Sequence, residues 1–269
     1  MSGIAASDAV VIEIGGITIA LHSRDSRFRQ LLEDRYAGFA TSAASPRFEF
    51  EVDLFEPSGT AQADDDVQVG LHSGEWLLQR GDFHARWDSR AGRGHIRQSR
   101  NPYAIDSVLR IVHTLILAKE GGFLVHAASA IRSGRAFLFA GVSGAGKTTI
   151  SRLAPSDATL LTDEISYVRR EGNDYCACGT PFAGELAKVG ENVSAPLSGL
   201  FLLEKGPENR IEAVAAPEAV RLLMRNILFF AEDAELVSLV FRSACEFVER
   251  VPVRRLIFVP DERVWEMIG

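Results

Sequence analysis

The spacing of apolar residues along the chain predicts short strands and a few helices. Residues 10–20 (VVIEIGGITIA) place β-branched residues on both sides of a Gly-Gly pair, which predicts a hairpin. Residues 25–39 carry apolar side chains at helical spacing behind Asp25, a residue suited to a helix N-cap. Residues 48–55 (FEFEVDLF) alternate with a period of two, which predicts a strand.

Three further segments in this part of the chain are EWLLQR, DFHARWD and GHIRQS, and the turns between them contain glycine. This pattern is typical of a β-meander. The polar stretch PSGTAQADDD, residues 57–66, predicts an exposed loop. Because no motif with catalytic chemistry occurs here, we assign residues 1–103 to a small α+β N-terminal domain of unassigned role.

The following residues predict a second, α/β domain over 104–269. A long apolar stripe predicts a helix over 104–120, ended by a Gly-Gly pair. Two strands follow, FLVHAASAIR and RAFLFAG, joined by a tight Ser-Gly turn. The remaining pattern predicts strands near 159–170, 174–179, 199–204, 210–215 and 253–259, and helices near 217–229 and 232–249.

A glycine-rich loop connects the second of these strands to a helix beginning near Lys147. Residues 141–148 (GVSGAGKT) fit the P-loop pattern G-x-x-x-x-G-K-[ST]. Glycines let backbone N–H groups converge on phosphate oxygens, and the start of the helix presents its positive dipole end to the same anion. Lys147 is suited to the β and γ phosphates, and the Thr148 hydroxyl to Mg²⁺. The expected nucleotide contacts are Gly141, Ser143, Gly144, Ala145, Gly146, Lys147, Thr148 and Thr149.

An apolar strand that ends in two acids follows the loop. Asp163 comes sixteen residues after Lys147, where a carboxylate of the Walker B type is expected. We therefore expect Asp163 to hold Mg²⁺ and Glu164 to polarise a nucleophile, while the alternative is a solvated strand end with ordinary acids.

Three other residues carry chemistry without a motif of their own. His126 lies between apolar residues, where a histidine satisfied within the core is the ordinary alternative to a catalyst. Glu185 follows a turn-forming GTPFAG segment. Arg225 lies in an apolar helical pattern. Its guanidinium group either faces a phosphate, or reaches solvent while the aliphatic part of the side chain packs against apolar neighbours.

The composition of the chain bears on its binding partners and its location in the cell. The formal net charge of −7 over 269 residues gives no indication of nucleic-acid or acidic-lipid binding. Three cysteines predict a reducing, cytoplasmic location, with Cys176 and Cys178 as reduced strand residues rather than metal ligands. The N-terminal residues lack the pattern of a signal peptide, and no apolar run approaches the ~20 residues that cross a bilayer.

Residues 121–170 together resemble the P-loop core of the HPr kinase/phosphorylase family and its shorter relatives. The likeness rests on the LVH segment ending at His126, the GVSGAGKTT loop and the Asp163-Glu164 pair, with Lys147 twenty-one residues after His126. It extends in part to the GTPF turn, the PVRRLIF strand and the terminal VWE segment. Two departures are Glu164, where the family usually has a second aspartate, and Thr148, where it often has serine.

The resemblance implies a P-loop kinase core of the HPr kinase/PEP carboxykinase-like type with a mixed β-sheet. It implies that His126 lies near the γ-phosphate and that Asp163 is the base for the acceptor hydroxyl. More loosely, it implies that Glu185 is a magnesium carboxylate and Arg225 a phosphate-facing residue. Homo-oligomers are also compatible with it, because HPr kinases self-assemble. The signatures of the reverse, phosphorylase activity are not matched.

The function expected from these features is transfer of the γ-phosphate of ATP, with Mg²⁺, to a hydroxyl acceptor. The resemblance favours a serine on a peptide or protein, and a small-molecule acceptor stays open. The alternative from a different class is a nucleotide-switched binding module with slow ATPase activity. A transporter-type ATPase is disfavoured because no LSGGQ-like signature occurs, and an adenylate-kinase-like enzyme because no arginine-rich lid follows the loop.

Overall fold

The computed structural model describes residues 9–56, 66–182, 184 and 190–268. Two compact units divide the chain, one formed by Met1–Val112 with Phe230–Asp233 and the other by His113–Phe229 with Ala234–Gly269. The division falls inside the long helix α2 (Pro102–Glu120), after the residue at which the sequence predicts the second domain to begin.

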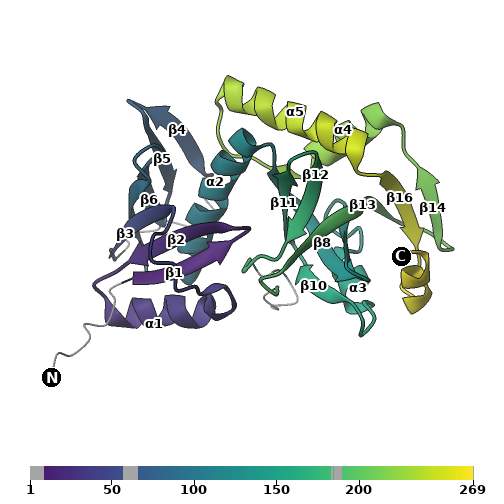
Figure 1. Cartoon of the computed structure of the whole chain (residues 1–269), viewed down its shortest axis with the longest axis horizontal. Helices are drawn as coiled ribbons and strands as arrows, with labels where there is room; N and C mark the ends of the chain where they lie inside the picture. Colours follow the sequence, from purple (N-terminus) through teal and green to yellow (C-terminus); the bar gives the residue numbers. More distant parts are fainter. Residues whose placement is uncertain (1–8, 57–65, 183, 185–189, 269) are drawn as a thin grey trace. The chain divides into compact units, whose positions relative to one another are not determined.

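The first unit is built on a mixed seven-stranded sheet in the order β1-β2-β3-β7-β6-β5-β4 (Figure 1). Strand β3 is parallel to both of its neighbours, β2 and β7, and the other neighbouring pairs are antiparallel. Alternate residues of β1, β3 and β6 are buried, as the period-two patterns predict. The strands are β1 (Ala9–Ile14), β2 (Ile17–His22), β3 (Phe48–Leu54), β4 (Gln68–His72), β5 (Glu75–Arg80), β6 (Phe83–Asp88) and β7 (Arg93–Gln98).

Helix α1 (Ser26–Arg35) begins where the sequence predicts, because the Asp25 carboxylate accepts the N–H of Phe28 at 2.9 Å. The 3₁₀ turn η1 (Ala37–Phe39) follows it. A buried polar cluster joins this region to the first half of α2: Asp106 accepts hydrogen bonds from the Arg35 guanidinium and, at 2.5 Å, from the Tyr36 hydroxyl.

The second unit holds a nine-stranded mixed sheet, ordered β10-β8-β11-β12-β13-β16-β14, with β9 beside β8 and β13, and β15 beside β8. Strands β9, β13 and β16 are parallel neighbours, and the remaining pairs are antiparallel. The strands are β8 (Phe123–Arg132), β9 (Arg135–Ala140), β10 (Thr159–Thr162), β11 (Ile165–Glu171), β12 (Asp174–Cys178), β13 (Ser194–Lys205), β14 (Arg210–Ala213), β15 (Ile227–Leu228) and β16 (Val253–Phe258).

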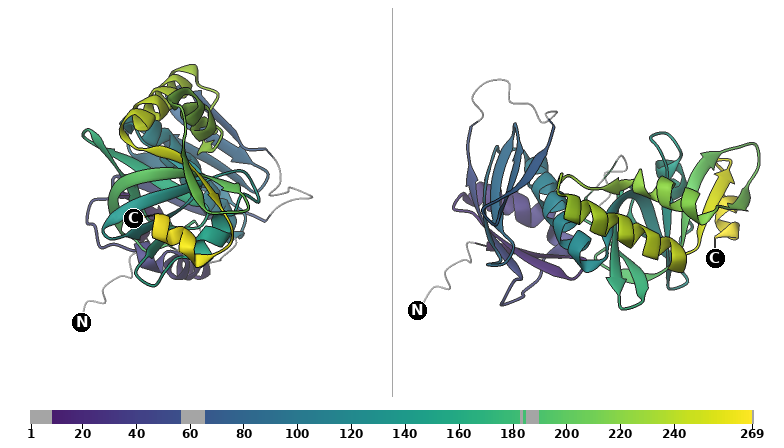
Figure 2. Two further views of the ribbon diagram at one scale, coloured as in Figure 1. Left: turned by 90° about the vertical axis from the view of Figure 1, so that its right-hand side faces the viewer. Right: turned by 90° about the horizontal axis from the view of Figure 1, so that it is seen from above.

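Helices cover both faces of this sheet, with one apolar cluster under each group (Figures 1 and 2). Helices α4 (Ala216–Met224) and α5 (Ala234–Arg250) bury Leu223 and Phe247 against one face. Helix α3 (Lys147–Arg152) and the C-terminal 3₁₀ segment η2 (Glu262–Met267) bury Ile150 and Trp265 against the other. The structure is therefore α/β with two mixed sheets.

Most of the predicted elements are confirmed, and two predictions in the second unit are wrong in their extent. The helix expected over 217–229 ends at Met224, because Asn226 turns the chain and its carbonyl oxygen accepts the His126 N–H at 2.7 Å. The next two residues then pair with β8 as β15. The strand expected near 159–170 is two strands, β10 and β11, which pair with different parts of β8. Strand β4 and segment η2 have no counterpart among the predicted elements.

The exposed loop predicted over 57–66 lies almost wholly outside the described residues. Cys176 and Cys178 lie on one strand, as expected, and are free buried thiols whose sulfur atoms are 4.0 Å apart. In the described part of the chain, no helix has the length and apolar character needed to span a bilayer.

Candidate functional site

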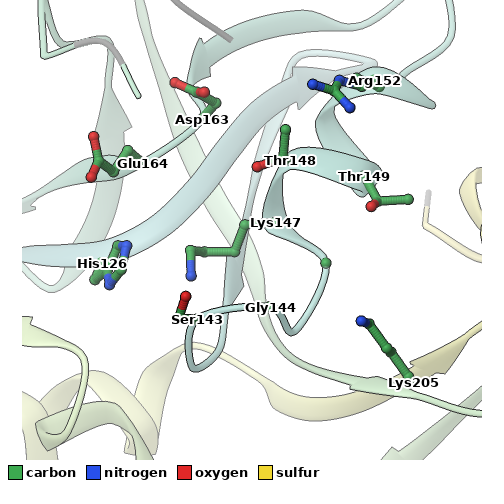
Figure 3. Close-up of a pocket in the computed structure, with 11 residues that line it drawn as sticks. His126, Ser143, Gly144, Lys147, Thr148, Thr149, Arg152, Asp163, Glu164 and Lys205 are labelled. Atoms are coloured by element: carbon green, nitrogen blue, oxygen red, sulfur yellow. The ribbon is translucent and has the colours of Figure 1, made fainter. Parts of the chain in front are cut away.

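A cavity of about 410 Å³ opens where the glycine loop, residues 141–148, leaves β9 (Figure 3). The backbone of this loop depends on its glycines. Gly144 and Gly146 have φ values of +78° and +114°, which side chains with a Cβ rarely adopt. A Cβ on Gly146 would also stand 2.6 Å from Cζ of Phe258, so β16 sets the depth of the loop from beneath.

Lys147 is 9% exposed and lies along the inner side of the loop. Its Nζ donates to the carbonyl oxygen of Gly141 at 2.8 Å, which holds the ammonium group over the loop backbone. The loop is closed by a hydrogen bond from the Ala145 N–H to the carbonyl oxygen of Val142 at 3.0 Å. The result is a closed turn with a nearly buried cation at its centre, the arrangement expected for binding phosphate oxygens.

The acidic pair lies at a corner of the sheet beside this loop. Strands β10 and β11 both pair with β8, so the two residues between them, Asp163 and Glu164, bulge out of the sheet into the cavity. The Thr162 hydroxyl oxygen shapes the corner by accepting the N–H groups of Glu164 and Ile165 at 3.2 and 3.3 Å. The spacing of residues in the sequence does not predict this bulge, because the bulge results from the pairing of both strands with β8.

Asp163 is 3% exposed, and Gly184, at the end of the GTPFAG segment, holds it in position. Its Oδ1 accepts the N–H of Gly184 at 2.9 Å, while a Cβ on Gly184 would stand 2.9 Å from Oδ2. The buried Thr180 hydroxyl donates to the carbonyl oxygen of Ile165 at 3.0 Å and so ties the same segment to β11. A buried carboxylate held by a backbone N–H is suited to a fixed role toward a cation or a proton.

His126 lines the cavity on the acidic side of Lys147. It lies on β8 opposite Ile165, one residue beyond the acidic pair, and Figure 3 shows its ring on the same side of Lys147 as Glu164. The structure thus brings His126, Lys147, Thr148, Asp163 and Glu164 to a single cavity.

The other side of the cavity carries residues that the sequence alone did not single out. Arg152 is in the last turn of α3, and Lys205 is the last residue of β13. Both line the cavity on the side of Thr149 (Figure 3). Arg152 follows Thr148 by four residues, one helical turn, which is the signal that was available in the sequence. No spacing rule connects Lys205 to the loop, because parallel pairing of β13 with β9 brings it there.

The C-terminal residues support this site from behind. The indole N–H of Trp265 donates to the carbonyl oxygen of Ile150 at 3.0 Å, and Phe258 packs beneath Gly146. Helix α3 is only six residues long, so η2 and β16 hold it in place more than its own hydrogen bonds do.

Two of the predicted site residues are not among those lining the cavity. Arg225 is exposed at the end of α4, one residue before Asn226, whose carbonyl oxygen accepts the His126 N–H. Glu185 lies outside the described residues. Within the described ranges, no group of three or more His, Cys, Asp or Glu residues is arranged to hold a metal ion. Thr148 and Asp163 line the cavity and offer oxygen atoms that fit Mg²⁺, a cation that binds few protein oxygens.

The fold and cavity together define an α/β protein with two mixed sheets and a lysine-centred glycine loop beside a buried acidic corner. Residues 98–269 match the model of a family described as "SynChlorMet cassette protein ScmC". The match covers more than half of the chain, and the protein therefore belongs to this family. A search of curated proteins found no match.

Among solved structures, the chain is similar to the Hpr(Ser) kinase/phosphatase from Coxiella burnetii. The sequence identity is 11%, the similarity covers 54% of this chain and 90% of that chain, and the TM-score is 0.29. A similarity this remote carries no inference about activity. The family whose model matches is a different one from the HPr kinase/phosphorylase family that the motifs resemble.

Proposed function

We propose that this protein is an ATP- and Mg²⁺-dependent phosphotransferase that moves the γ-phosphate to a hydroxyl acceptor, a serine on a peptide or protein. The observation that carries the proposal is the meeting of Lys147, Thr148 and Asp163 in one cavity. A phosphate-binding loop and a buried carboxylate are the two parts that phosphoryl transfer requires to be adjacent.

The loop supports the first part of this proposal. Gly141, Gly144 and Gly146 leave three backbone positions of the loop without side chains that would keep a phosphate away, and Gly146 has no space for a Cβ. Lys147 already lies over the loop, so its charge is placed before a ligand arrives. Such preorganised charge stabilises the negative oxygens of a transferring phosphoryl group.

The acidic corner supports the second part. In the proposed reaction the acceptor oxygen forms a bond to the γ-phosphorus while the bond from that phosphorus to the β–γ bridging oxygen breaks, and ADP leaves. The acceptor proton passes to the carboxylate of Asp163, which the Gly184 N–H holds in position. His126 and Glu164 line the same end and would orient the acceptor.

The residues of the cavity also fit a magnesium ion. The Thr148 hydroxyl and the Asp163 carboxylate are oxygen ligands of the kind Mg²⁺ prefers, with water and phosphate oxygens completing its shell. When bound, the ion would neutralise charge on the β and γ phosphates.

The test measures ADP release and acceptor phosphorylation with purified protein, Mg²⁺ and radiolabelled ATP. The acceptors offered are the purified products of neighbouring genes, and separately serine and small hydroxyl compounds. We expect ADP release only when a suitable acceptor is present, loss of nucleotide binding in Lys147→Ala, and a fall in rate of about 10²–10⁴-fold with binding retained in Asp163→Asn. Asp174→Asn, on an exposed acid at the start of β12, is the matched control.

The outcomes separate this proposal from a nucleotide-switched binding module. A module would hydrolyse ATP slowly without an acceptor, and its partner binding would require Lys147 but tolerate His126→Ala. Hydrolysis that needs no acceptor and is unchanged in Asp163→Asn would refute the kinase proposal. Phosphorylation of a small hydroxyl compound alone would change the acceptor class and leave the reaction in place.

A further inference from the structure

The cavity at the glycine loop has two ends that differ in charge. His126, Asp163 and Glu164 line one end, and Arg152 and Lys205 line the other, with Lys147 between them (Figure 3). The phosphates of a nucleotide are strongly negative. The end of the cavity that carries two cations and the end that carries two carboxylates therefore interact differently with them.

Arg152 and Lys205 come from elements that the fold places together. Arg152 lies one turn after Thr148 on α3, and Lys205 ends β13, the parallel neighbour of the strand that leads into the loop. Both side chains are exposed, and neither makes a hydrogen bond or ion pair with a described residue. By contrast, Arg255 and Arg210 in the same unit each pair with two glutamates. The cations at the cavity are therefore not engaged in holding the described fold together.

Their place along the loop indicates which phosphate they meet. In a P-loop the lysine reaches the β and γ phosphates, and the following hydroxyl ligates Mg²⁺. Figure 3 shows the Lys147 ammonium group pointing toward His126, away from Arg152 and Lys205. The β–γ end of a bound nucleotide then points to the acidic corner, and the α-phosphate and nucleoside point to the two cations.

We infer that Arg152 and Lys205 bind the α-phosphate and nucleoside end of the nucleotide, and thereby fix its direction in the cavity. This inference rests on the proposed function, because it concerns the nucleotide of that reaction. The reversed nucleotide would carry its γ-phosphate away from Asp163, the proposed base, and toward Arg152 and Lys205 at the other end. It follows that the acceptor approaches from the side of His126 and Glu164.

The experiment compares the binding of Mg²⁺–ATP and Mg²⁺–pyrophosphate by titration calorimetry. Pyrophosphate offers only the two phosphates that the loop and Lys147 hold. For Lys205→Ala and Arg152→Ala we expect the Kd for ATP to rise about tenfold each, as for the loss of one charge-assisted contact, and the Kd for pyrophosphate to change less than about twofold. Lys205→Arg should restore most of the ATP affinity.

Lys119→Ala and Arg242→Ala are the matched controls, because both residues are exposed helix cations outside the cavity. The two cavity variants and the two control variants should keep the thermal stability of the parent protein. Lys147→Ala is the reference variant, and it should weaken both ligands.

Three results would overturn the inference. Equal weakening of ATP and pyrophosphate by Lys205→Ala would place the cations at the β–γ end. Unchanged ATP affinity with a raised KM for the acceptor would make them acceptor-binding residues, and the proposed kinase function would survive. A parent protein that binds neither ATP nor pyrophosphate would remove the proposed function and this inference together.

Discussion

The contact between the glycine loop and β16 predicts a large effect of one added methyl group. In Gly146→Ala the new Cβ would stand 2.6 Å from Cζ and 3.1 Å from Cε1 of the Phe258 ring. That ring is buried among the residues under α3, so it has little room to withdraw. The alanine would also have to keep a φ of +114°, or the loop would have to change shape.

Two contributions add in this variant. Holding a non-glycine residue at such a φ costs about 1–3 kcal/mol, and forcing a methyl group into a packed site costs roughly another 1–3 kcal/mol. We expect the free energy of unfolding of the second unit to fall by about 2–6 kcal/mol. Gly144 separates the two contributions, because its φ is +78° and nothing lies within 4 Å of its added Cβ. Gly144→Ala should therefore lose only about 1–2 kcal/mol.

The assay is urea unfolding followed by the fluorescence of Trp265, in a parent protein carrying Trp76→Phe and Trp87→Phe. The chain has three tryptophans, and both replaced residues belong to the first unit, so the remaining signal reports on the second. Trp265 bonds directly to α3, which begins at the altered loop.

A double-mutant cycle with Phe258→Leu tests the steric part. The smaller side chain should recover about 1–2 kcal/mol of the loss in Gly146→Ala and nothing in Gly144→Ala. If both glycine variants lose the same free energy and Phe258→Leu recovers none of it, β16 does not set the depth of the loop.

The remaining predictions concern buried polar contacts. Asp106→Ala leaves the Arg35 charge and the Tyr36 hydroxyl without their buried acceptor, and unfolding of the first unit should become easier by about 3–5 kcal/mol, with a smaller loss in Asp106→Asn. Burial and the nearby Asp106 carboxylate raise the pKa of Tyr36 well above its usual 10.0. Above that pH the unfolded chain loses this proton before the folded one, so stability should fall by about 1.4 kcal/mol per pH unit, and a pH series of unfolding curves should show this slope reduced in Tyr36→Phe. Trp265→Phe removes the hydrogen bond to Ile150 and should lower the free energy of unfolding by about 1 kcal/mol, and with it the thermal midpoint. An unchanged midpoint would show that η2 does not hold α3.

Local patterns predicted much of the fold because their physical causes are local. The Asp25 cap, the Gly-Gly hairpin and the alternation in β3 each depend on neighbours a few residues away, and each is observed. The order of strand, glycine loop and helix around Lys147 has the same origin. The extent of α4 was overestimated because the pairing of β15 with β8, a distant strand, stops the helical pattern.

The sequence was sufficient to predict the glycine loop of residues 141–148 between a strand and a helix, and the acidic pair that follows it. Tertiary contacts, which no local pattern predicts, place this pair in the same cavity, set Gly184 against Asp163 and bring Lys205 to the loop. The physical reason is that the first set depends on backbone conformations of adjacent residues, which their own side chains select. The second set depends on which strands pair, and that is settled by the burial of two apolar clusters drawn from the whole unit.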